Sequence, residues 1–426
     1  MRFLYVLLIG IVSSHSQADS VVVHENEQAS LNSLMRQVGI NHSDMKIGTR
    51  KLNDKFSKYI NIKNRYYYKD KSRKDFWFVT NAKNKISALK ISWTNLSDLT
   101  EVSNFSDLKF LQIDSNDLVN VNGLKKLKSL MYLDISGNDK LVDIGGINNL
   151  PNLVEIDAVT LKNISIKGMK NLPRLERFLC DLCLINDIAP LSNLTSLKVL
   201  KMGVKQKNLN YLRNLSGLEA LEVKGANLVA VTSIQSMVNL KHLEIEYAKI
   251  DSLPLSKSNV NLEFIRLGDV SINTFPNFKG FNNLKSLTIT GTKIDEVNSI
   301  RNLPNLEVLR FSRNNKLTKV TNLNNLPSLK ELKVYKGPLE TFNTSNLPSL
   351  EELNLSETNI NKLTNFGNYP SLRRLIINDT KITSLKGIEK APVLHSVQAG
   401  YDVKNDPENE KILRSLRKNI FKRKPQ

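Results

Sequence analysis

Aliphatic residues recur along most of the chain in one fixed pattern, Leu-x-x-Leu-x-Ile/Leu-x-x-Asn/Thr. The pattern is clearest at residues 108–116, 130–138, 284–292 and 350–358. Its leading aliphatic residue stands at positions 86, 108, 130, 153, 175, 197, 218, 240, 262, 284, 306, 329, 350, 372 and 394. One match would mean little, but fifteen in one register, with a mean spacing of 22 residues, predict stacked structural repeats over residues 86–393.

The spacing within one unit predicts its local structure. Leu111 and Ile113 are two residues apart, so both point to one side of a short strand, while Phe110, Gln112 and Asp114 point to the other. Aliphatic residues then follow at three-residue steps from 118 to 127, which is typical of an extended or 3₁₀ return segment. One such unit cannot bury its own apolar side, so neighbouring units must stack into a continuous core.

A short polar residue follows each strand where the chain must turn. Asn116, Asn138 and Asn314 occupy this ninth position, threonine replaces asparagine at 94, 292, 358 and 380, and Cys183 fills it once. Such side chains can satisfy backbone groups that the turn leaves unpaired. With this unit and turn, residues 86 to about 397 resemble the internalin-type leucine-rich-repeat proteins.

The resemblance implies an α/β leucine-rich-repeat solenoid of about 15 units of 22 residues. Its parallel sheet would line a curved inner face, and 3₁₀ or extended segments would form the convex side. Proteins of this family are bacterial surface or secreted molecules that recognise host receptors, often through the concave sheet. The resemblance therefore implies an adhesin or virulence factor with a protein partner.

The two ends have different expected roles. Arg2, the apolar run 3–12 and the Ser16-x-Ala18 pattern predict a signal peptide over residues 1–18, so we expect a secreted protein, outside the cell, on its surface or in the periplasm. Residues 19–85 are predicted to form an N-terminal cap with helical stripes at 31–38 and 52–60 and a strand at 76–79. Residues 394–426 are predicted to form a C-terminal cap helix and a basic tail.

The two cysteines, Cys180 and Cys183, fall on a buried strand position and on the turn position of one unit. Residues three apart on an extended strand lie about 10 Å from each other, which is too far for a disulfide. We therefore expect both cysteines to be reduced, buried and unreactive. The six residues after the next strand, 203–208, form a basic stretch without the usual turn residue, and we expect a bulge there.

Charge and candidate chemistry narrow the function classes. The formal charge of +20 favours anionic partners, but basic and acidic residues are interleaved, so nucleic acid is not expected. No segment reaches membrane-spanning length, and no arrangement of nucleophile, base and acid or cofactor-binding loop is found. His242, Glu244 and Glu246 alternate on one strand beside Glu222 and could hold a metal. The neighbouring Arg266 gives the carboxylates another partner, so we interpret the group as an ordinary charged strand.

The register also places the side chains of the expected concave face. Near its N-terminal end these are aromatic and acidic, and Trp93, Phe110 and Tyr132 are expected to form an exposed aromatic trio. The alternative is that the N-terminal cap folds over Trp93 and leaves Phe110 and Tyr132 as ordinary sheet packing. Toward the C-terminal half they turn basic. The predicted partner-binding residues are Trp93, Phe110, Asp114, Tyr132, Asp134, Asp157, Arg266, Arg310, Lys333 and Tyr335. Two functions remain open: a secreted, non-catalytic protein-binding module, or a polyanion-binding or structural surface protein.

Overall fold

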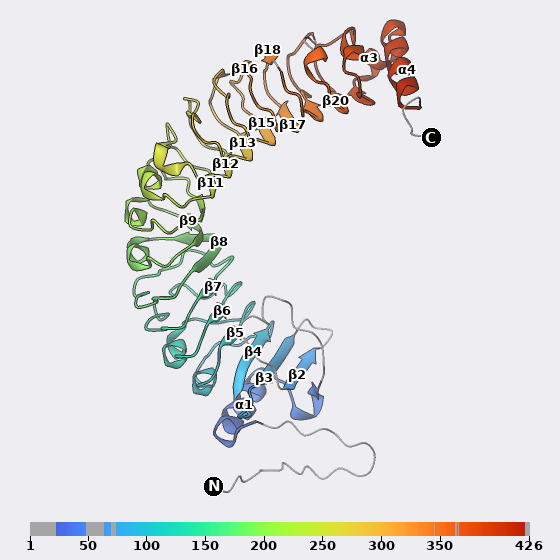
Figure 1. Ribbon diagram of the computed structural model, residues 1–426. Helices are drawn as coiled ribbons and strands as arrows, with labels where there is room; N and C mark the ends of the chain where they lie inside the picture. Colours follow the sequence, from blue (N-terminus) through green and yellow to red (C-terminus); the bar gives the residue numbers. More distant parts are fainter. Residues whose placement is uncertain are drawn as a thin grey trace, which may run out of the picture. The chain divides into compact units, whose positions relative to one another are not determined.

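The computed structural model describes residues 23–47, 64–69, 74–344, 346–362, 364 and 366–421 (Figure 1). The chain forms two compact units, Met1–Val204 and Lys205–Gln426. Together they contain about 14 turns of roughly 22 residues, which confirms the predicted parallel-sheet solenoid. The predicted signal peptide, the helical stripe at 52–60 and the basic tail at 422–424 lie outside the described residues.

The first unit begins with one helix and a short antiparallel region. Helix α1 (Glu25–Gln37) precedes strands β1 (Lys46–Ile47), β2 (Asn64–Lys69), β3 (Asp75–Thr80) and β4 (Ile86–Ser92), which pair in antiparallel order. From β4 onward every pairing is parallel. The strands are β5 (Phe110–Gln112), β6 (Tyr132–Asp134), β7 (Glu155–Asp157), β8 (Arg177–Ile185) and β9 (Val199–Val204).

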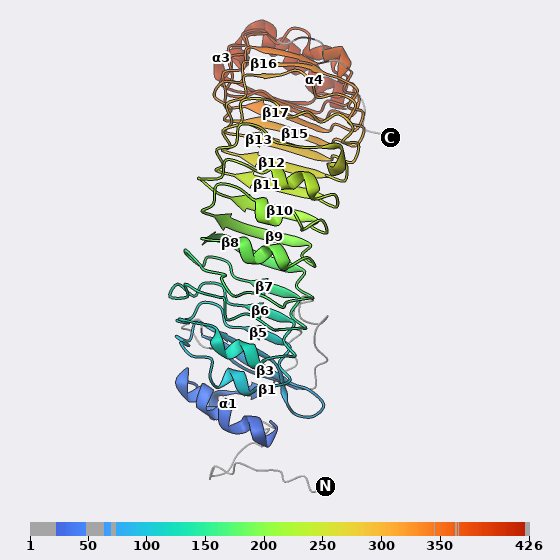
Figure 2. The ribbon, with the colours of Figure 1, turned by 90° about the vertical axis from the view of Figure 1, so that its left-hand side faces the viewer.

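The second unit continues with parallel strands alone, which Figure 2 shows as successive rungs. They are β10 (Ala220–Lys224), β11 (His242–Glu246), β12 (Phe264–Gly268), β13 (Ser286–Thr290), β15 (Val308–Ser312), β17 (Glu331–Tyr335), β19 (Glu352–Asn354), β20 (Arg374–Ile377) and β21 (Ser396–Ala399). A second parallel sheet contains β14 (Glu296–Val297), β16 (Lys319–Leu323) and β18 (Thr341–Thr344). Helices α3 (Tyr401–Asn405) and α4 (Pro407–Phe421) follow the last strand.

The return segments contain short 3₁₀ helices, as the three-residue spacing predicts. Those in the repeats span Val102–Asn104, Asn122–Lys126, Ala189–Asn193, Asn210–Leu212, Thr232–Ser236, Lys257–Asn259, Phe366–Asn368 and Ile388–Lys390, and another, His42–Asp44, precedes the repeats. In one turn, Leu118, Leu124 and Leu127 are fully buried. The core therefore runs between the strands and these return segments.

The turn asparagines form an internal ladder between successive units. Asn138 is fully buried, and its Nδ2 donates to the carbonyls of Ile113 at 3.0 Å and Ile135 at 2.8 Å. Its Oδ1 accepts the N–H of Leu118 at 3.1 Å. One side chain thus satisfies backbone groups of its own unit and of the preceding one, which confirms the role predicted for the ninth position.

The prediction for the cysteines is wrong, because Cys180 and Cys183 form a disulfide with their Cα atoms 5.4 Å apart. Strand β8 is not regularly extended there: Leu182 has a φ of +61°, and the pairing with β9 shifts between Cys180 and Leu184. The bulge presses on β9 at Gly203, where a Cβ would lie 2.0 Å from the Cys183 carbonyl oxygen. Both cysteines are buried, as expected.

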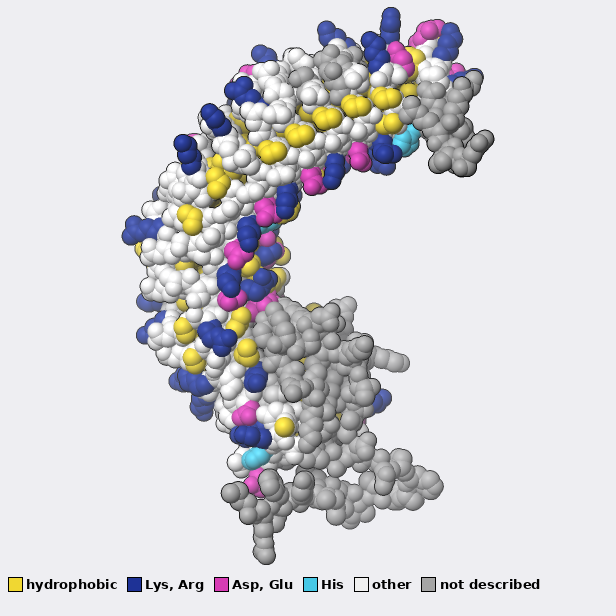
Figure 3. Space-filling model, viewed as in Figure 1, with side chains coloured by type: hydrophobic (Ala, Val, Ile, Leu, Met, Phe, Trp, Pro, Cys, Tyr) yellow, Lys and Arg dark blue, Asp and Glu magenta, His cyan; other side chains and the backbone are white. Residues whose placement is uncertain are grey.

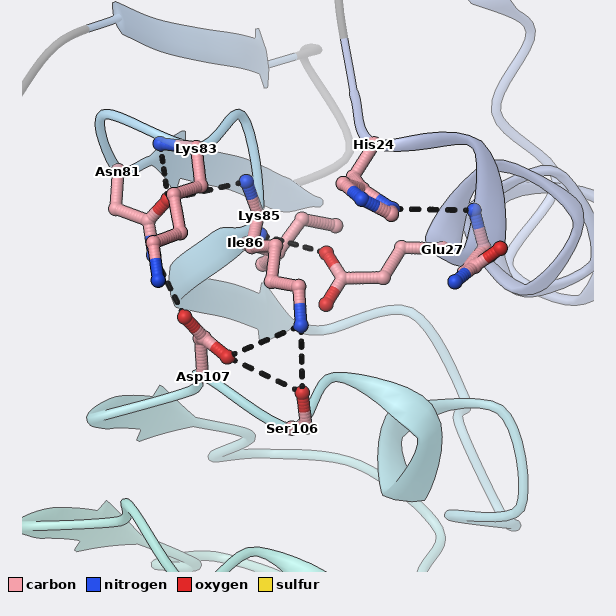
Figure 4. A network of polar contacts seen from close by, with 9 residues as sticks. His24, Glu27, Asn81, Lys83, Lys85, Ile86, Ser106 and Asp107 are labelled. Atoms are coloured by element: carbon pink, nitrogen blue, oxygen red, sulfur yellow. Dashed lines mark hydrogen bonds and ion pairs between the residues drawn. The ribbon is translucent and has the colours of Figure 1, made fainter. Parts of the chain in front are cut away.

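Helix α1 and the β3–β4 turn are fixed to the first repeat by polar contacts (Figure 4). The Oε2 of the buried Glu27 accepts the backbone N–H of Ile86 at 2.7 Å. In the turn, Asn81 donates to Asp107 at 3.0 Å, and Lys85 forms an ion pair with the same carboxylate at 3.4 Å. The predicted helical stripe at 31–38 is confirmed, since Leu31, Leu34, Met35 and Val38 are buried.

Helix α4 begins at Pro407, as predicted, and is held by Asn409. This side chain is only 2% exposed; its Oδ1 accepts the Leu385 N–H at 2.7 Å and its Nδ2 donates to the Thr383 carbonyl at 2.8 Å. Leu416, two turns further along the same side of the helix, is also buried. These two contacts of Asn409 are to the last return segment of the solenoid, and a third, from Nδ2 to the Val403 carbonyl at 3.0 Å, is to α3.

Candidate protein interaction face

The strands of the main sheet carry alternating buried and open positions. In β12, Ile265 and Leu267 point into the core, while Phe264 and Arg266 are exposed. Successive strands keep this register, so Glu244, Arg266 and Thr288 are direct neighbours. We call the positions that alternate with the core residues the open strand face.

The aromatic trio predicted in the first unit is not an exposed cluster. Phe110 and Tyr132 are 0% and 2% exposed, and their rings stack with centroids 4.4 Å apart. Trp77 of β3 stacks on the other side of Phe110, with centroids 6.0 Å apart. Phe110 and Tyr132 are register partners on neighbouring strands, and the residue of β4 that pairs with Phe110 is Ala88. Trp93 therefore does not belong to this column of paired residues.

The antiparallel hairpin of β3 and β4 explains why Phe110 and Tyr132 are buried. Strand β3 extends the sheet before the first repeat, and its Trp77 and Val79 form one buried cluster with Ala88, Phe110 and Tyr132. Trp93 instead lies in the turn after β4, where it is 50% exposed and has a φ of +58°. The alternation of Trp77 and Val79 in the sequence was the available signal that β3 adds apolar side chains to this face.

The predicted acidic residues lie together on neighbouring strands of the first unit. Asp134 and Asp157 are register partners on β6 and β7, and the Tyr132 hydroxyl donates to Asp157 at 2.7 Å. Burial raises the pKa of Asp134 to about 6, and the charges of Asp114 and Asp157 add to the effect. Asp114 accepts a hydrogen bond from the Ser92 hydroxyl. These carboxylates are therefore engaged with the fold as well as close to one another.

The face that the sequence predicts to be basic is a network of paired charges. Arg310 bonds to Glu331, and Lys333 lies 3.2 Å from Glu331 and 2.8 Å from Glu352. Burial opposes the charged form of Glu331, but Arg310 and Lys333 outweigh it and lower the pKa of this carboxyl. Glu331 stands two positions before Lys333 on β17, and Glu352 is its register partner on β19, so both glutamates lie on the same face. The prediction of a basic surface here is therefore wrong, although Arg310 remains partly exposed.

Arg266 and Phe264 lie on β12, on the open strand face of the second unit. Arg266 lies 3.3 Å from Glu244 and 3.2 Å from Glu246. Phe264 is 42% exposed, and its ring centroid is 6.1 Å from that of His242. An exposed aromatic ring thus stands among charged groups that already have partners. Tyr335, at the end of β17, is half-buried.

A second charged feature, which we call the rim ladder, consists of the residues that come directly after the leading leucines of successive repeats. Acidic and basic residues alternate strictly at Glu219, Lys241, Glu263, Lys285, Glu307 and Lys330. Each lysine forms an ion pair with the glutamate of the preceding repeat, at 2.9, 2.6 and 2.9 Å in chain order. Figure 3 shows the alternation as dark blue and magenta side chains along one edge of the second unit. The repeat register contains this ladder, and comparing charges at 22-residue steps would have found it.

Comparison with solved structures shows that the fold is similar to that of internalins, which are bacterial leucine-rich-repeat proteins. An internalin (inlF) from Listeria monocytogenes matches with a TM-score of 0.55 and 20% identity, covering 74% of this chain and 90% of its own. The functional domain of InlJ from the same species, described as including a cysteine ladder, gives 0.54 and 18%, with 74% and 68% covered. A Leptospira interrogans leucine-rich-repeat protein gives 0.49 and 18%, with 78% and 93% covered.

Comparisons with family models and with curated proteins gave no match. No protein-family model matches the sequence, and no curated protein matches it. Neither of the two internalin structures is described as an enzyme. Among the described residues, no helix is long and apolar enough to cross a membrane.

Proposed function

We propose that this chain is a secreted, non-catalytic module that binds a protein partner on its open strand face, as a bacterial adhesin or virulence factor. The apolar run 3–12 and the Ser16-x-Ala18 pattern support export. The fold shared with internalins supports a protein ligand, because solenoids of this kind offer long surfaces for recognition.

The observation that carries the proposal is Phe264, exposed beside Arg266 on the open strand face. Aromatic and arginine side chains dominate the binding energy of protein interfaces, especially where surrounding groups exclude water. The paired charged groups next to Phe264 would exclude water from its ring in this way. Of the residues predicted to bind from the sequence, Trp93, Asp114, Asp157, Arg266, Arg310, Lys333 and Tyr335 remain candidates, because each is at least partly exposed. Phe110, Tyr132 and Asp134 do not, since they are buried.

The test is capture of surface proteins from host-cell extracts by the chain and by a Phe264→Ala variant. We expect the variant to lose at least tenfold in affinity for the captured protein, because removing an aromatic anchor typically costs about 2 kcal/mol or more. Tyr401→Ala is the matched control, since Tyr401 is 82% exposed but lies on α3 and not on a strand. Equal capture by both variants would contradict the proposed face.

A further inference from the structure

Two carboxylates and one imidazole converge on the open strand face of the second unit. Glu222 lies on β10, and His242 and Glu244 lie on the adjacent β11, where Glu222 and Glu244 are register partners. The Nε2 of His242 is 3.5 Å from Glu222 Oε1 and 3.8 Å from Glu244 Oε2. One ligand atom from each residue lies within 4.8 Å of the other two.

These separations suit a shared metal ion better than direct hydrogen bonds. In tetrahedral coordination with bonds of 2.0–2.1 Å, ligand atoms lie about 3.4 Å from each other. His242 Nε2 is buried without a hydrogen-bond partner among the described residues, and its distances of 3.5 and 3.8 Å to the two carboxylates are longer than a usual hydrogen bond. The side chains are partly exposed, His242 to 36% and Glu222 and Glu244 to 19% each, which leaves a path for an ion from solvent.

Neighbouring residues contact the group and orient its side chains. The Nε of Arg266 contacts Glu244 at Oε1, which leaves Oε2, the oxygen facing His242. Lys224 and the Nη2 of Arg266 contact Glu246, at 3.3 and 3.2 Å, so this carboxylate offsets the two cations. The ring of Phe264 packs near the imidazole. Partners of this kind fix the direction of metal ligands in proteins.

We propose that Glu222, His242 and Glu244 form a binding site for one divalent transition-metal ion of the zinc class. Imidazole with carboxylates is a donor set that suits Zn²⁺, and two carboxylates match its charge. Three protein ligands leave a fourth coordination position open toward the exposed side of the strand face. A water molecule or a side chain of a bound partner can occupy that position.

The test is titration of the full, untagged chain with zinc chloride by isothermal calorimetry at pH 7.5. We expect one Zn²⁺ per chain, with affinity reduced at least tenfold in His242→Ala and in Glu222→Gln. Glu222→Gln is nearly isosteric, so it separates loss of a ligand from loss of the fold. His395→Ala and Glu263→Gln are the matched controls, because His395 is exposed on another repeat and Glu263 pairs with Lys285 on the rim ladder.

A second readout uses Co²⁺ in place of zinc, since a tetrahedral site gives visible absorption that disappears in His242→Ala. Failure of the wild-type chain to bind zinc would overturn the proposal. So would equal binding by His242→Ala and the controls, which would assign any binding to other groups. The titration needs no protein partner, so its outcome is independent of whether the proposed function is correct.

Discussion

At the scale of single residues, position within the repeat decides what each side chain can do. Asn138 shows the favourable case, since its donor and acceptor both meet backbone groups of the turn. Glu27 shows the costly case. It is 2% exposed, and its Oε1 is buried without a hydrogen bond among the described residues. Burial raises the pKa of this carboxyl from its usual 4.5 to about 7, although the Ile86 N–H opposes the shift.

This shift predicts a pH dependence of stability. A pKa that is higher in the folded state means that folding favours the protonated carboxyl. The stabilising contribution is therefore complete below about pH 4.5 and is lost as the pH rises through 7. Glu27→Gln stays neutral and keeps an acceptor for Ile86, so we expect it to be about 2 kcal/mol more stable than wild type at pH 8 and similar to it at pH 4.5.

The measurement is urea unfolding of both proteins at the two pH values. Glu25→Gln is the control, because Glu25 lies in the same first turn of α1 but is exposed. A Glu27→Gln advantage that is equal at both pH values would show that the carboxyl does not titrate in this range.

At the scale of elements, the antiparallel hairpin of β3 and β4 determines which side chains of the first repeats are buried. Strand β3 pairs with β4 and places Trp77 against Phe110, so a column expected to face solvent is part of the core. We propose that α1 and β1–β3 together cap the N-terminal end of the solenoid, and that α4 caps the other end. Their hydrogen bonds to the outermost repeats, through Glu27 and Asn409, support this.

Replacing Phe110 by alanine tests the hairpin's role. Truncation of a buried, stacked phenylalanine leaves a cavity, so we expect a loss of about 3–5 kcal/mol in the free energy of unfolding. Phe264→Ala should cost less than about 1 kcal/mol, because its ring is 42% exposed. The two variants are compared by urea denaturation followed by circular dichroism. Similar losses for both would mean that Phe110 is not part of the core.

At the scale of the whole molecule, the excess of basic residues does not form one binding surface among the described strands. The rim ladder alternates in sign, and Arg310 and Lys333 are paired with Glu331 and Glu352. This pairing argues against the alternative function of polyanion binding. The formal charge of +20 still gives a general attraction to anionic polymers at low salt.

We therefore predict that binding to immobilised heparin is lost as salt rises from about 0.01 to 0.15 M, where the screening length falls from about 30 to about 8 Å. A Glu263→Lys, Glu307→Lys variant breaks the alternation of the rim ladder and should elute at higher salt than wild type. Elution of wild type only well above physiological salt would instead favour a polyanion ligand.

The sequence by itself determined the repeat, its length, the strand register and the buried turn asparagines. These features follow from local periodicity: a residue two positions away shares a strand face, and a residue 22 positions away shares a column. The same register contains the rim ladder. It also placed Glu222, His242 and Glu244 on one face, although their interpretation as an ordinary charged strand came from Arg266 alone.

Tertiary structure decided the features that depend on contacts outside this periodicity. Phe110 and Tyr132 are buried because β3 extends the same face, and no 22-residue rule describes a hairpin. Cys180 reaches Cys183 because Leu182 adopts a positive φ, which breaks the extended geometry that the spacing assumed. Arg310 and Lys333 are neutralised by glutamates on neighbouring strands, since the effective charge of a surface depends on which side chains touch.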